Sequence, residues 1–292
     1  MKTLITVAFW VITTSLNAQS ISLGLIADCQ FCNCPYSEKW NNNYSKSSFR
    51  LQQAVDTFNT KNVNFTFHLG DFIDREYTSY EIVTPIFNSL KMPHYHVLGN
   101  HDFSVEDTLK SKVPKRLNMS KLYSSMEIQN WRLILLDGTD ISPYSSMDSC
   151  KIAYSDSLMN QYKKEGRIQA KPWNGAIGRN QLLWLESELN QADKLKRDVL
   201  ILCHFPIYPG GTANLWNDIE VIQLIEKHRS VKAFINGHHH PGNYAIKNGI
   251  HYLTLQGMVG SLNQNSFCIG LLKQSQIEII GYGREPNRIL KF

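Results

Sequence analysis

Five apolar, strand-like runs of this 292-residue chain each end directly in a short polar motif, and this arrangement constrains the fold more than any other feature. In chain order the motifs are Asp28-Cys29-Gln30, Gly70-Asp71, Gly99-Asn100-His101-Asp102, a lone His204 and Gly237-His238-His239-His240. In layered α/β proteins, the carboxyl ends of the strands converge on one crevice. We therefore expect residues that are far apart in the sequence to meet in a single cleft.

The apolar periodicity alternates between strand-like and helix-like segments along most of the chain. It predicts strands at 21–27, 63–69, 94–98, 122–128, 131–136, 198–203 and 231–235. It predicts helices at 47–60, 80–90, 181–191 and 219–227. From Tyr244 onward the chain is expected to be all-β, with a tight turn at Asn248-Gly249. This order indicates α/β layers built on a mixed sheet or on two packed sheets.

Residues 138–173 are the one long stretch without clear periodicity. Loops of this length in a compact domain are usually functional, so we expect an insertion near the mouth of the active site. A disordered surface excursion is the alternative. No repeat or linker marks a boundary, and residues 19–292 are expected to form a single domain.

The N-terminus has the features of a signal peptide. Lys2 precedes a short apolar run over residues 4–12, and Leu16-Asn17-Ala18 is a plausible cleavage site. The run is too short to be a stable membrane span. We predict that residues 1–18 are removed and that the protein is exported, to the periplasm or as a secreted protein. The alternative is a buried N-terminal strand or helix.

Composition and charge exclude some classes of partner. The formal charge is +5, but no run of five or more basic residues occurs, so no nucleic acid is expected as a partner. A small-molecule substrate and a monomeric chain are the expectations. Of the six cysteines, Cys29, Cys203 and Cys268 lie in apolar runs, where buried thiols are expected. Cys150 is expected to pair with Cys32 or Cys34, and a zinc site at residues 29–34 is disfavoured because a fourth ligand is missing.

The residue types in the five motifs suit divalent metal ions. Carboxylates, amide oxygens and imidazoles are ligands for Mn²⁺, Fe²⁺ or Zn²⁺. Residues two apart in an extended segment share a face, so Asp28 and Gln30 are expected to point together, as are His238 and His240. Two divalent metal ions roughly 3.5–4 Å apart can bind both the attacking and the leaving oxygen of a reacting phosphoryl group.

As a set, the motifs resemble the calcineurin-like metallophosphoesterase superfamily, whose pattern is D-x-H, G-D, G-N-H-D/E, an isolated His and G-H-x-H. The resemblance implies a four-layer αββα sandwich with mixed central sheets. The chain departs from this pattern at the first motif, where Gln30 stands at the position of the histidine of D-x-H. In this respect the chain is similar to the manganese-dependent ADP-ribose/CDP-alcohol diphosphatase subfamily, which it also resembles at residues 174–175, 181–185, 204–208 and 281–284.

The resemblance also implies roles for individual residues. One metal ion would be bound by Asp28, Gln30 and His240, the other by Asn100, His204 and His238, and Asp71 would bridge both. A metal-bridging hydroxide would attack phosphorus in line. His101 would stabilise developing charge or protonate the leaving oxygen, with Asp102 orienting its ring. The amide oxygen of Gln30 is a harder ligand than imidazole, which favours Mn²⁺ over Zn²⁺.

Substrate contacts are predicted less directly. Trp40, Tyr44, Tyr208 and Trp216 lie in expected loops near strand ends, where they could stack on a nucleobase or simply pack. Arg284 and Arg288 could contact a phosphate or be solvated. Asp74 could orient a histidine or cap a helix. The leading hypothesis is a Mn²⁺-dependent hydrolase of nucleoside diphosphate-linked compounds. The alternatives are a phosphomonoesterase or phosphodiesterase, or a non-catalytic scaffold on the same fold.

Overall fold

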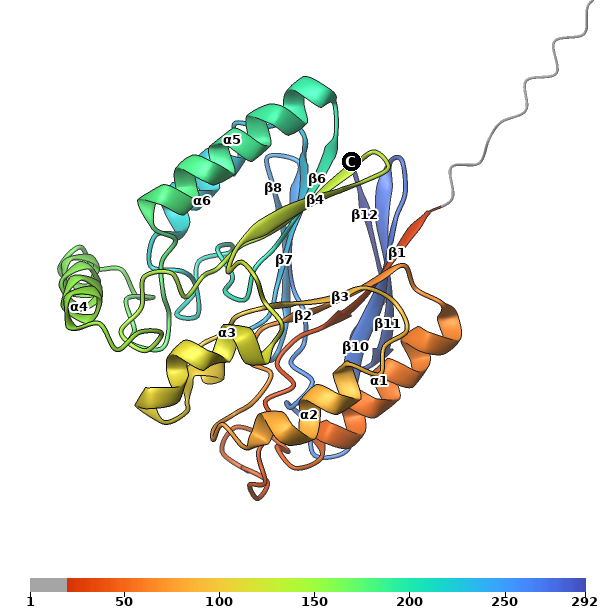
Figure 1. The fold of residues 1–292 in the computed structure, drawn as a ribbon. Coiled ribbons are helices and arrows are strands. Elements are labelled where there is room, and N and C mark those ends of the chain that lie inside the picture. The colour runs from red at the N-terminus through yellow and green to blue at the C-terminus, as the bar shows by residue number, and fades with distance from the viewer. Residues whose placement is uncertain (1–19) are drawn as a thin grey trace, which may run out of the picture.

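The computed structural model describes residues 20–292, and two six-stranded mixed sheets packed face to face form its centre (Figure 1). The first sheet has the order β12-β11-β10-β1-β2-β3. Its strands are β1 (Ile21–Ile26), β2 (Phe65–Leu69), β3 (His94–Val97), β10 (Ser266–Leu272), β11 (Gln276–Gly283) and β12 (Arg288–Lys291). In this sheet β1, β2 and β3 are parallel, and the C-terminal strands pair antiparallel.

The second sheet has the order β4-β5-β6-β7-β9-β8. Its strands are β4 (Ser124–Ile128), β5 (Trp131–Leu135), β6 (Asp198–Leu202), β7 (Val231–Asn236), β8 (Asn243–Lys247) and β9 (Ile250–Thr254). The four inner strands are parallel, whereas β4 and β8 are antiparallel to their neighbours. Asn248 and Gly249 both have positive φ at the β8–β9 turn, as a tight hairpin requires.

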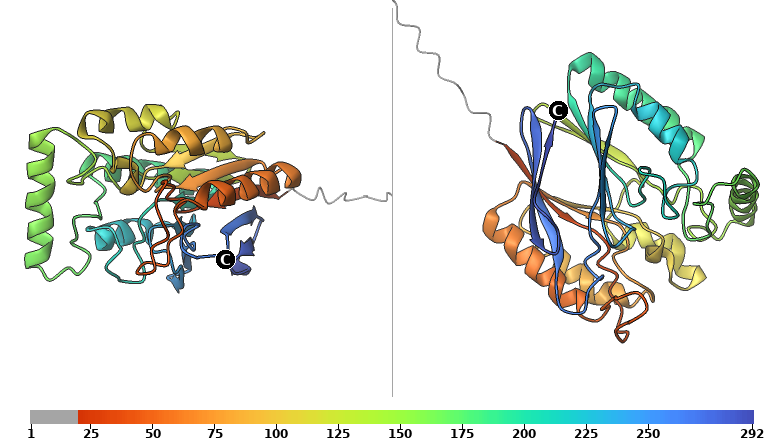
Figure 2. Two further views of the ribbon diagram at one scale, coloured as in Figure 1. Left: turned by 90° about the horizontal axis from the view of Figure 1, so that it is seen from below. Right: turned by 180° about the vertical axis from the view of Figure 1, so that it is seen from behind.

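Helices cover the outer face of each sheet (Figures 1 and 2). On the first sheet lie α1 (Ser47–Lys61) and α2 (Ser79–Phe87), and on the second lie α5 (Arg179–Leu195) and α6 (Asp218–Ile225). The order of layers is therefore α, β, β, α, which confirms the expected four-layer sandwich.

Alternation along the central strands explains this layering. In β1, Leu23 and Leu25 point into the core between the sheets, whereas Ile26 packs against the α1–α2 layer. Gly24 also faces that layer, and a Cβ there would lie 2.7 Å from the Phe58 ring. Strands buried on both faces have continuous apolar sequences, and this is why the motifs stand out so clearly at their ends.

Residues 138–173 were expected to lack regular structure, but they contain the 16-residue helix α4 (Ser149–Lys164). Asp148 caps this helix by accepting hydrogen bonds from the amides of Cys150 and Lys151. Only Ser155 and Met159 of α4 are buried, so the helix lacks the apolar stripe that would reveal it in the sequence. Figure 1 shows α4 standing apart from the two sheets.

The remaining described elements are short. They are the 3₁₀ helices η1 (His101–Phe103) and η2 (Asp107–Lys112), and the single helical turn α3 (Val113–Arg116). In the described part of the chain, no helix combines the length and the apolar character that a membrane crossing requires. The predicted signal peptide at residues 1–18 lies outside the described residues.

Candidate dinuclear metal site

The five polar motifs lie at the carboxyl ends of five parallel strands. Asp28 and Gln30 follow β1, Asp71 follows β2 and Asn100 follows β3 in the first sheet, while His204 follows β6, and His238 and His240 follow β7, in the second. Segments from two facing sheets therefore contribute to one site, as the sequence predicts.

The chain turns sharply where it leaves these strands. Asp28, Gln30, Asp71 and His238 have φ values of 53°, 43°, 57° and 66°, in the left-handed region that non-glycine residues rarely adopt. We expected Asp28 and Gln30 to share a face because the segment would be extended. The segment is not extended, and the left-handed conformation of both residues sets the direction of their side chains instead. Such backbone conformations cluster at functional sites. Gly99 allows the close approach of Asp71, whose Oδ1 would lie 2.2 Å from a Cβ there.

Asp71 is the centre of the donor cluster. Its Oδ2 lies 3.2 Å from Nε2 of His204 and 3.2 Å from Nε2 of Gln30. Nε2 of His204 in turn lies 3.1 Å from Nδ1 of His238. Asp71, His204 and His238 each offer a ligand atom, and these atoms lie within 4.8 Å of one another. On the other side of Asp71, Nε2 of His240 lies 3.8 Å from Oδ1 of Asp28.

Two orphaned oxygens show that the donor set fits metal ions. Oε1 of Gln30 and Oδ1 of Asn100 are buried and have no hydrogen-bond partner among the described residues. Buried polar atoms nearly always have a hydrogen-bond partner, so these two oxygens are expected to bind a group that is not part of the polypeptide. A divalent cation bound also by carboxylates and imidazoles is such a partner.

Backbone and amide oxygens fix the tautomer of all three histidines. Nδ1 of His204 contacts the carbonyl oxygen of Leu69 at 2.8 Å, and Nε2 of His238 contacts Oδ1 of Asn174 at 2.8 Å. Nδ1 of His240 lies 3.3 Å from Oδ1 of Asn42. Each ring is thus held through one nitrogen and turns its other nitrogen into the cluster, as metal-binding histidines do. The sequence predicted the three histidines. Asn174 stands out only through the family resemblance, and nothing in the sequence singles out Asn42.

The Asp71 carboxylate dominates the electrostatics of the cluster. Burial raises the pKa of Asp71, but His204 and His101 outweigh this and hold it below its usual range. Burial lowers the pKa of His204, yet the Asp71 carboxylate raises it to about 9. Burial lowers the pKa of His240 to about 4, so this imidazole is neutral. Burial also raises the pKa of Asp28 to about 7, and the nearby Asp71 carboxylate adds to that effect. The Asp71 carboxylate therefore lies beside a protonated His204, and a divalent cation would take the place of that proton, because metal ligands bind in their deprotonated form.

The structure corrects the role of Asp102. Its carboxylate is fully buried beneath the site and accepts hydrogen bonds from the amides of Gly99, Asp71 and Phe72 and from the hydroxyl of Tyr80. No hydrogen bond joins it to the His101 ring within the described residues. The prediction that Asp102 orients His101 is wrong, because the 3₁₀ turn points neighbouring side chains in different directions. Asp102 instead supports the backbone of the loops that carry Asp71 and Asn100.

Asp74 takes the orienting role. Nδ1 of His101 lies 3.0 Å from the carbonyl oxygen of Asp74 and 3.4 Å from its carboxylate. The amide of His101 donates to Oδ1 of Asp71 at 2.7 Å. Of the two roles considered for Asp74, orienting a histidine is supported, since α2 has Thr78 rather than Asp74 at its N-cap.

The donor cluster opens into a cavity of about 630 Å³. Besides metal-site residues, this cavity is lined by Lys39, Trp40, Tyr44, Trp173 and His239. Trp40 is 64% exposed and Trp173 is 48% exposed, so a ligand in the cavity can reach both side chains. Nζ of Lys39 lies 4.8 Å from the centroid of the Trp40 ring. Trp40 and Tyr44 were among the predicted aromatic contacts, whereas Trp173, the last residue of the stretch without periodicity, was not singled out.

Three predicted substrate contacts do not line this cavity. Trp216 is fully buried and donates through Nε1 to the carbonyl of Lys171. Tyr208 packs on Tyr252, with their ring centroids 5.1 Å apart. Arg284 donates to Gln256 and Gly257. Tyr208 and Trp216 follow His204 closely in the sequence and Arg284 follows β11, but all three side chains pack against or hydrogen-bond to the surrounding structure.

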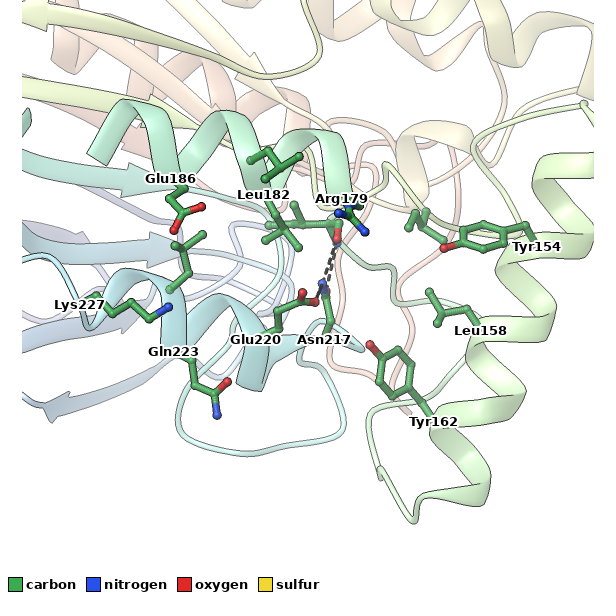
Figure 3. Close-up of a pocket in the computed structure, with 14 residues that line it drawn as sticks. Tyr154, Leu158, Tyr162, Arg179, Leu182, Glu186, Asn217, Glu220, Gln223 and Lys227 are labelled. Atoms are coloured by element: carbon green, nitrogen blue, oxygen red, sulfur yellow. Dashed lines mark hydrogen bonds between the residues drawn. The ribbon is translucent and has the colours of Figure 1, made fainter. Parts of the chain in front are cut away.

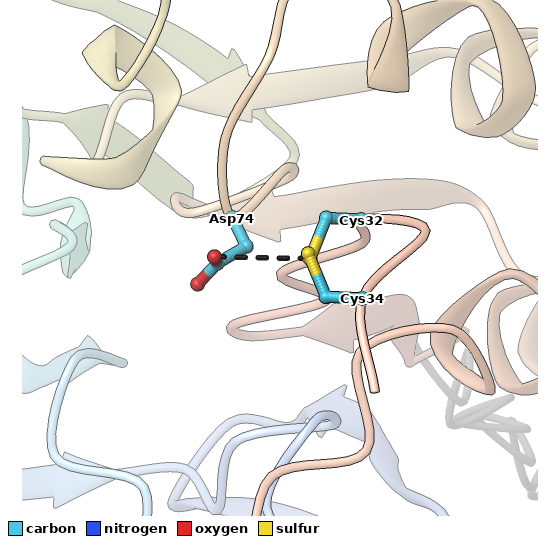
Figure 4. A group of neighbouring side chains, drawn as sticks. All are labelled: Cys32, Cys34 and Asp74. Carbon is cyan, nitrogen blue, oxygen red and sulfur yellow. Dashed lines mark hydrogen bonds between the residues drawn. A yellow bond between two sulfur atoms is a disulfide. The ribbon is translucent and has the colours of Figure 1, made fainter. Parts of the chain in front are cut away.

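The cysteine pairing also differs from the expectation. Cys32 and Cys34 form a disulfide with each other, beside Asp74 (Figure 4). Cys150, at the exposed start of α4, is a free thiol, so the predicted pairing of Cys150 is wrong. Cys29, Cys203 and Cys268 are buried free thiols, as predicted.

A second cavity, of about 470 Å³, lies between α4, α5 and α6 (Figure 3). Apolar side chains, Tyr154 and Tyr162 line it together with Arg179, Glu186 and Glu220. The described residues that line it include no histidine or cysteine, so the clustered metal donors belong to the first cavity.

An αββα sandwich whose strand ends bring carboxylates, amides and imidazoles around one central aspartate defines a two-metal hydrolase. The chain belongs to the calcineurin-like phosphoesterase family, whose model matches residues 21–242. It is therefore a metal-dependent phosphoester hydrolase by family.

Relatives that share most of the chain agree with this assignment. The chain is 28% identical to the manganese-dependent ADP-ribose/CDP-alcohol diphosphatase of Arabidopsis thaliana, over 80% of this chain and 85% of that one. It is 26% identical to the Mus musculus protein of the same name, over 93% of each chain. A crystal structure of a dimetal phosphatase from Danio rerio superimposes with a TM-score of 0.84 at 24% identity, over 93% of this chain and 99% of that one. The resemblance noted in the sequence is thus confirmed.

Proposed function

We propose that this protein is a Mn²⁺-dependent diphosphatase that hydrolyses the diphosphate bond of nucleoside diphosphate-linked small molecules, such as ADP-ribose or CDP-alcohols. The observation that carries the proposal is the cavity in which the Asp71 cluster opens directly onto Trp40 and Trp173. The names of the relatives in Arabidopsis and mouse support the same substrate class.

The cavity suits a substrate that has both a base and a phosphate chain. Its volume of about 630 Å³ lies within the usual range for small-molecule sites. Two accessible tryptophan side chains can stack on a nucleobase, and Lys39 adds a positive charge at the rim. A phosphomonoester of a small alcohol would use the metal site but leave the aromatic part of the cavity empty.

The chain's own residues supply binding and proton transfer. Two bound divalent cations would polarise the phosphoryl group and activate water. Asp28, Gln30 and His240 would hold one cation, Asn100, His204 and His238 the other, and Asp71 both. His101 lines the cavity with Nδ1 engaged by Asp74. Burial lowers the pKa of His101, but Asp71 and Asp74 outweigh this and raise it, so the protonated ring can donate its Nε2 proton to the leaving oxygen.

Gln30 supports manganese as the metal. Its amide offers a neutral, hard oxygen where most of the family has an imidazole nitrogen. Oxygen-rich sites suit Mn²⁺ better than nitrogen-rich sites do. Equal turnover with Zn²⁺ and Mn²⁺ would argue against this part of the proposal.

A substrate panel tests the activity. The purified protein is incubated with ADP-ribose, CDP-choline and p-nitrophenyl phosphate, each with Mn²⁺, Mg²⁺ or Zn²⁺. We expect turnover of the two diphosphates to exceed that of the monoester, and to be fastest with Mn²⁺. Exclusive turnover of p-nitrophenyl phosphate would make the protein a phosphomonoesterase. No turnover, with no metal bound, would indicate a scaffold.

We also propose that the protein is exported after removal of residues 1–18. The Cys32–Cys34 disulfide supports an oxidising compartment, since structural disulfides are rare in reducing ones. Mass spectrometry of the protein expressed in a host with a secretory pathway would test this. A mature N-terminus at Gln19 is expected, and an intact chain retained in the cytoplasm would contradict the proposal.

A further inference from the structure

Two guanidinium groups, that of the buried Arg50 and that of the partly buried Arg284, hold the loop of residues 256–261, which lies between β9 and β10. Arg50, from α1, donates to the carbonyl oxygens of Met258, Val259 and Ser261 at 2.9, 3.2 and 2.6 Å. Arg284, directly after β11, donates to the carbonyl oxygen of Gly257 at 2.6 Å and to Oε1 of Gln256 at 3.0 Å. Four of the six backbone carbonyl oxygens of this loop thus accept a hydrogen bond from an arginine.

Three amide groups of the same loop face the metal site. They donate to the backbone carbonyls of the residues that carry, or directly precede, two of the predicted ligands. These bonds are Gly257 N to His240 O at 3.0 Å, Met258 N to Ala27 O at 2.9 Å and Val259 N to Asp28 O at 3.0 Å. The 256–261 loop therefore lies between the two arginines and the backbone of Asp28 and His240.

Packing couples the loop tightly to these two ligands. A Cβ at Gly257 would lie 2.9 Å from Cδ2 of His240 and 3.2 Å from Cβ of Asp28. No space therefore remains between the loop backbone and the two side chains, and a shift of the loop would move them. No hydrogen bond joins the loop to Asn100, His204 or His238 in residues 20–292.

The two arginines bind neutral backbone and amide oxygens and no carboxylate among the described residues. Arg50 is 4% exposed, and no carboxylate pairs with it among the described residues. Burying a charge without an ionic partner is costly, and it persists where its hydrogen bonds satisfy groups that would otherwise be orphaned. By contrast Arg132, on β5, is equally buried but pairs with Glu127 and Glu188.

We propose that Arg50 and Arg284 are positioning residues for one metal ion: they hold the 256–261 loop against Asp28 and His240 and so set the geometry of that half of the site. The inference rests on the proposed two-metal function. It assigns Arg284 a task other than binding phosphate, and it predicts that loss of either arginine weakens one metal position more than the other.

Metal binding provides a readout that a purely structural role would not change. Mn²⁺ is titrated into metal-free protein by isothermal calorimetry, and the spin coupling of the bound ions is followed by EPR. Wild type, Arg284→Met, Arg284→Lys and Arg50→Met are compared. The matched control is Arg132→Met, which removes a buried arginine at the opposite end of the β5–β6 pair from His204. Arg284 is only partly buried, so its variants test the idea even if Arg50→Met does not fold.

We expect wild type and Arg132→Met to bind two Mn²⁺ ions with a coupled dinuclear spectrum. In Arg284→Met and Arg50→Met, the affinity for one ion should fall by roughly 10–100-fold, with a six-line mononuclear spectrum at limiting Mn²⁺. Arg284→Lys should recover part of the loss. Wild-type affinity for both ions in the Arg284→Met protein would overturn the inference alone, as would an equal loss in Arg132→Met. Failure of wild type to bind two ions would overturn the inference and the proposed function together.

Discussion

The Nδ1 atom of His101 lies 3.0 Å from the backbone carbonyl oxygen of Asp74, and the Asp74 carboxylate lies 3.4 Å from the same nitrogen. This pair fixes the ring so that Nε2 faces the cavity above the Asp71 cluster. The contact crosses from the loop after β3 to the loop after β2, and no sequence motif links the two residues. It places the proton donor of the proposed reaction under the control of a residue outside the metal ligands.

The first prediction concerns this pair. His101→Gln should lower kcat by roughly 100- to 10,000-fold, the usual contribution of a general acid. Asp74→Asn keeps the backbone contact but removes the carboxylate, and should lower kcat by about tenfold. Steady-state kinetics with ADP-ribose measures both effects, and elemental analysis should show an unchanged Mn²⁺ content. A wild-type kcat in the His101→Gln protein would remove His101 from the mechanism.

Asp102 should behave differently from His101, because it accepts amide hydrogen bonds on both carboxylate oxygens. Asp102→Asn would set an NH₂ group against a backbone N–H. We expect a loss of about 1–3 kcal/mol in the free energy of unfolding, as for other unsatisfied buried groups. Urea denaturation measures this loss. A variant of normal stability that loses only kcat would instead support a direct action of Asp102 on His101.

The two tryptophans should discriminate between substrates. If they stack on the base, Trp40→Ala and Trp173→Ala should each raise KM for ADP-ribose by roughly tenfold, given about 1–3 kcal/mol per stacked base. KM for p-nitrophenyl phosphate, which carries no base, should stay the same. Tyr154→Ala, in the second cavity, is a matched aromatic control. Equal effects on both substrates would show that the tryptophans shape the site without reading the base.

A buried carboxyl away from the metal site should make stability depend on pH. Burial raises the pKa of Asp137 to about 7, although Thr139 donates two hydrogen bonds to it. The folded protein therefore holds a proton that the unfolded chain has released above about pH 4. Between about pH 4 and pH 7 this group makes the free energy of unfolding fall as the pH rises.

Asp137→Asn keeps an oxygen acceptor but cannot ionise. The difference in unfolding free energy between the variant and wild type should therefore grow in favour of the variant from pH 4 to pH 7, by roughly 1.4 kcal/mol per unit of pKa shift. Thermal or urea unfolding at a series of pH values measures it. A constant difference across this range would contradict a raised pKa.

The sequence was sufficient to predict the elements that end in motifs. Strands buried on both faces have unbroken apolar runs, so β1, β2, β6 and β7 and the polar residues after them were found correctly. Family resemblance then supplied the layer order. The helix α4 was missed because it buries only Ser155 and Met159 and so shows no apolar stripe.

Side-chain direction after a strand was harder to predict. Asp74, and not the expected Asp102, contacts the His101 ring, because the 3₁₀ turn at His101 points adjacent side chains in different directions. Trp216 follows His204 by 12 residues, yet its side chain is buried and donates to the carbonyl of Lys171, and Arg284 donates to Gly257. Periodicity identifies the ends of strands, whereas the orientation of loop residues depends on long-range contacts that only the folded chain defines.

Asp71 is the residue on which both proposed cation positions depend. Mn²⁺ titration and turnover of ADP-ribose, measured on wild type and on Asp71→Ala, test whether it joins two cations in one site. Wild type should bind two ions as a coupled pair, whereas Asp71→Ala should show no coupled pair and should lose turnover by roughly a thousandfold or more, since removal of a shared ligand disrupts both positions. Two coupled Mn²⁺ ions and undiminished turnover in the Asp71→Ala protein would show that Asp71 does not join the two cations.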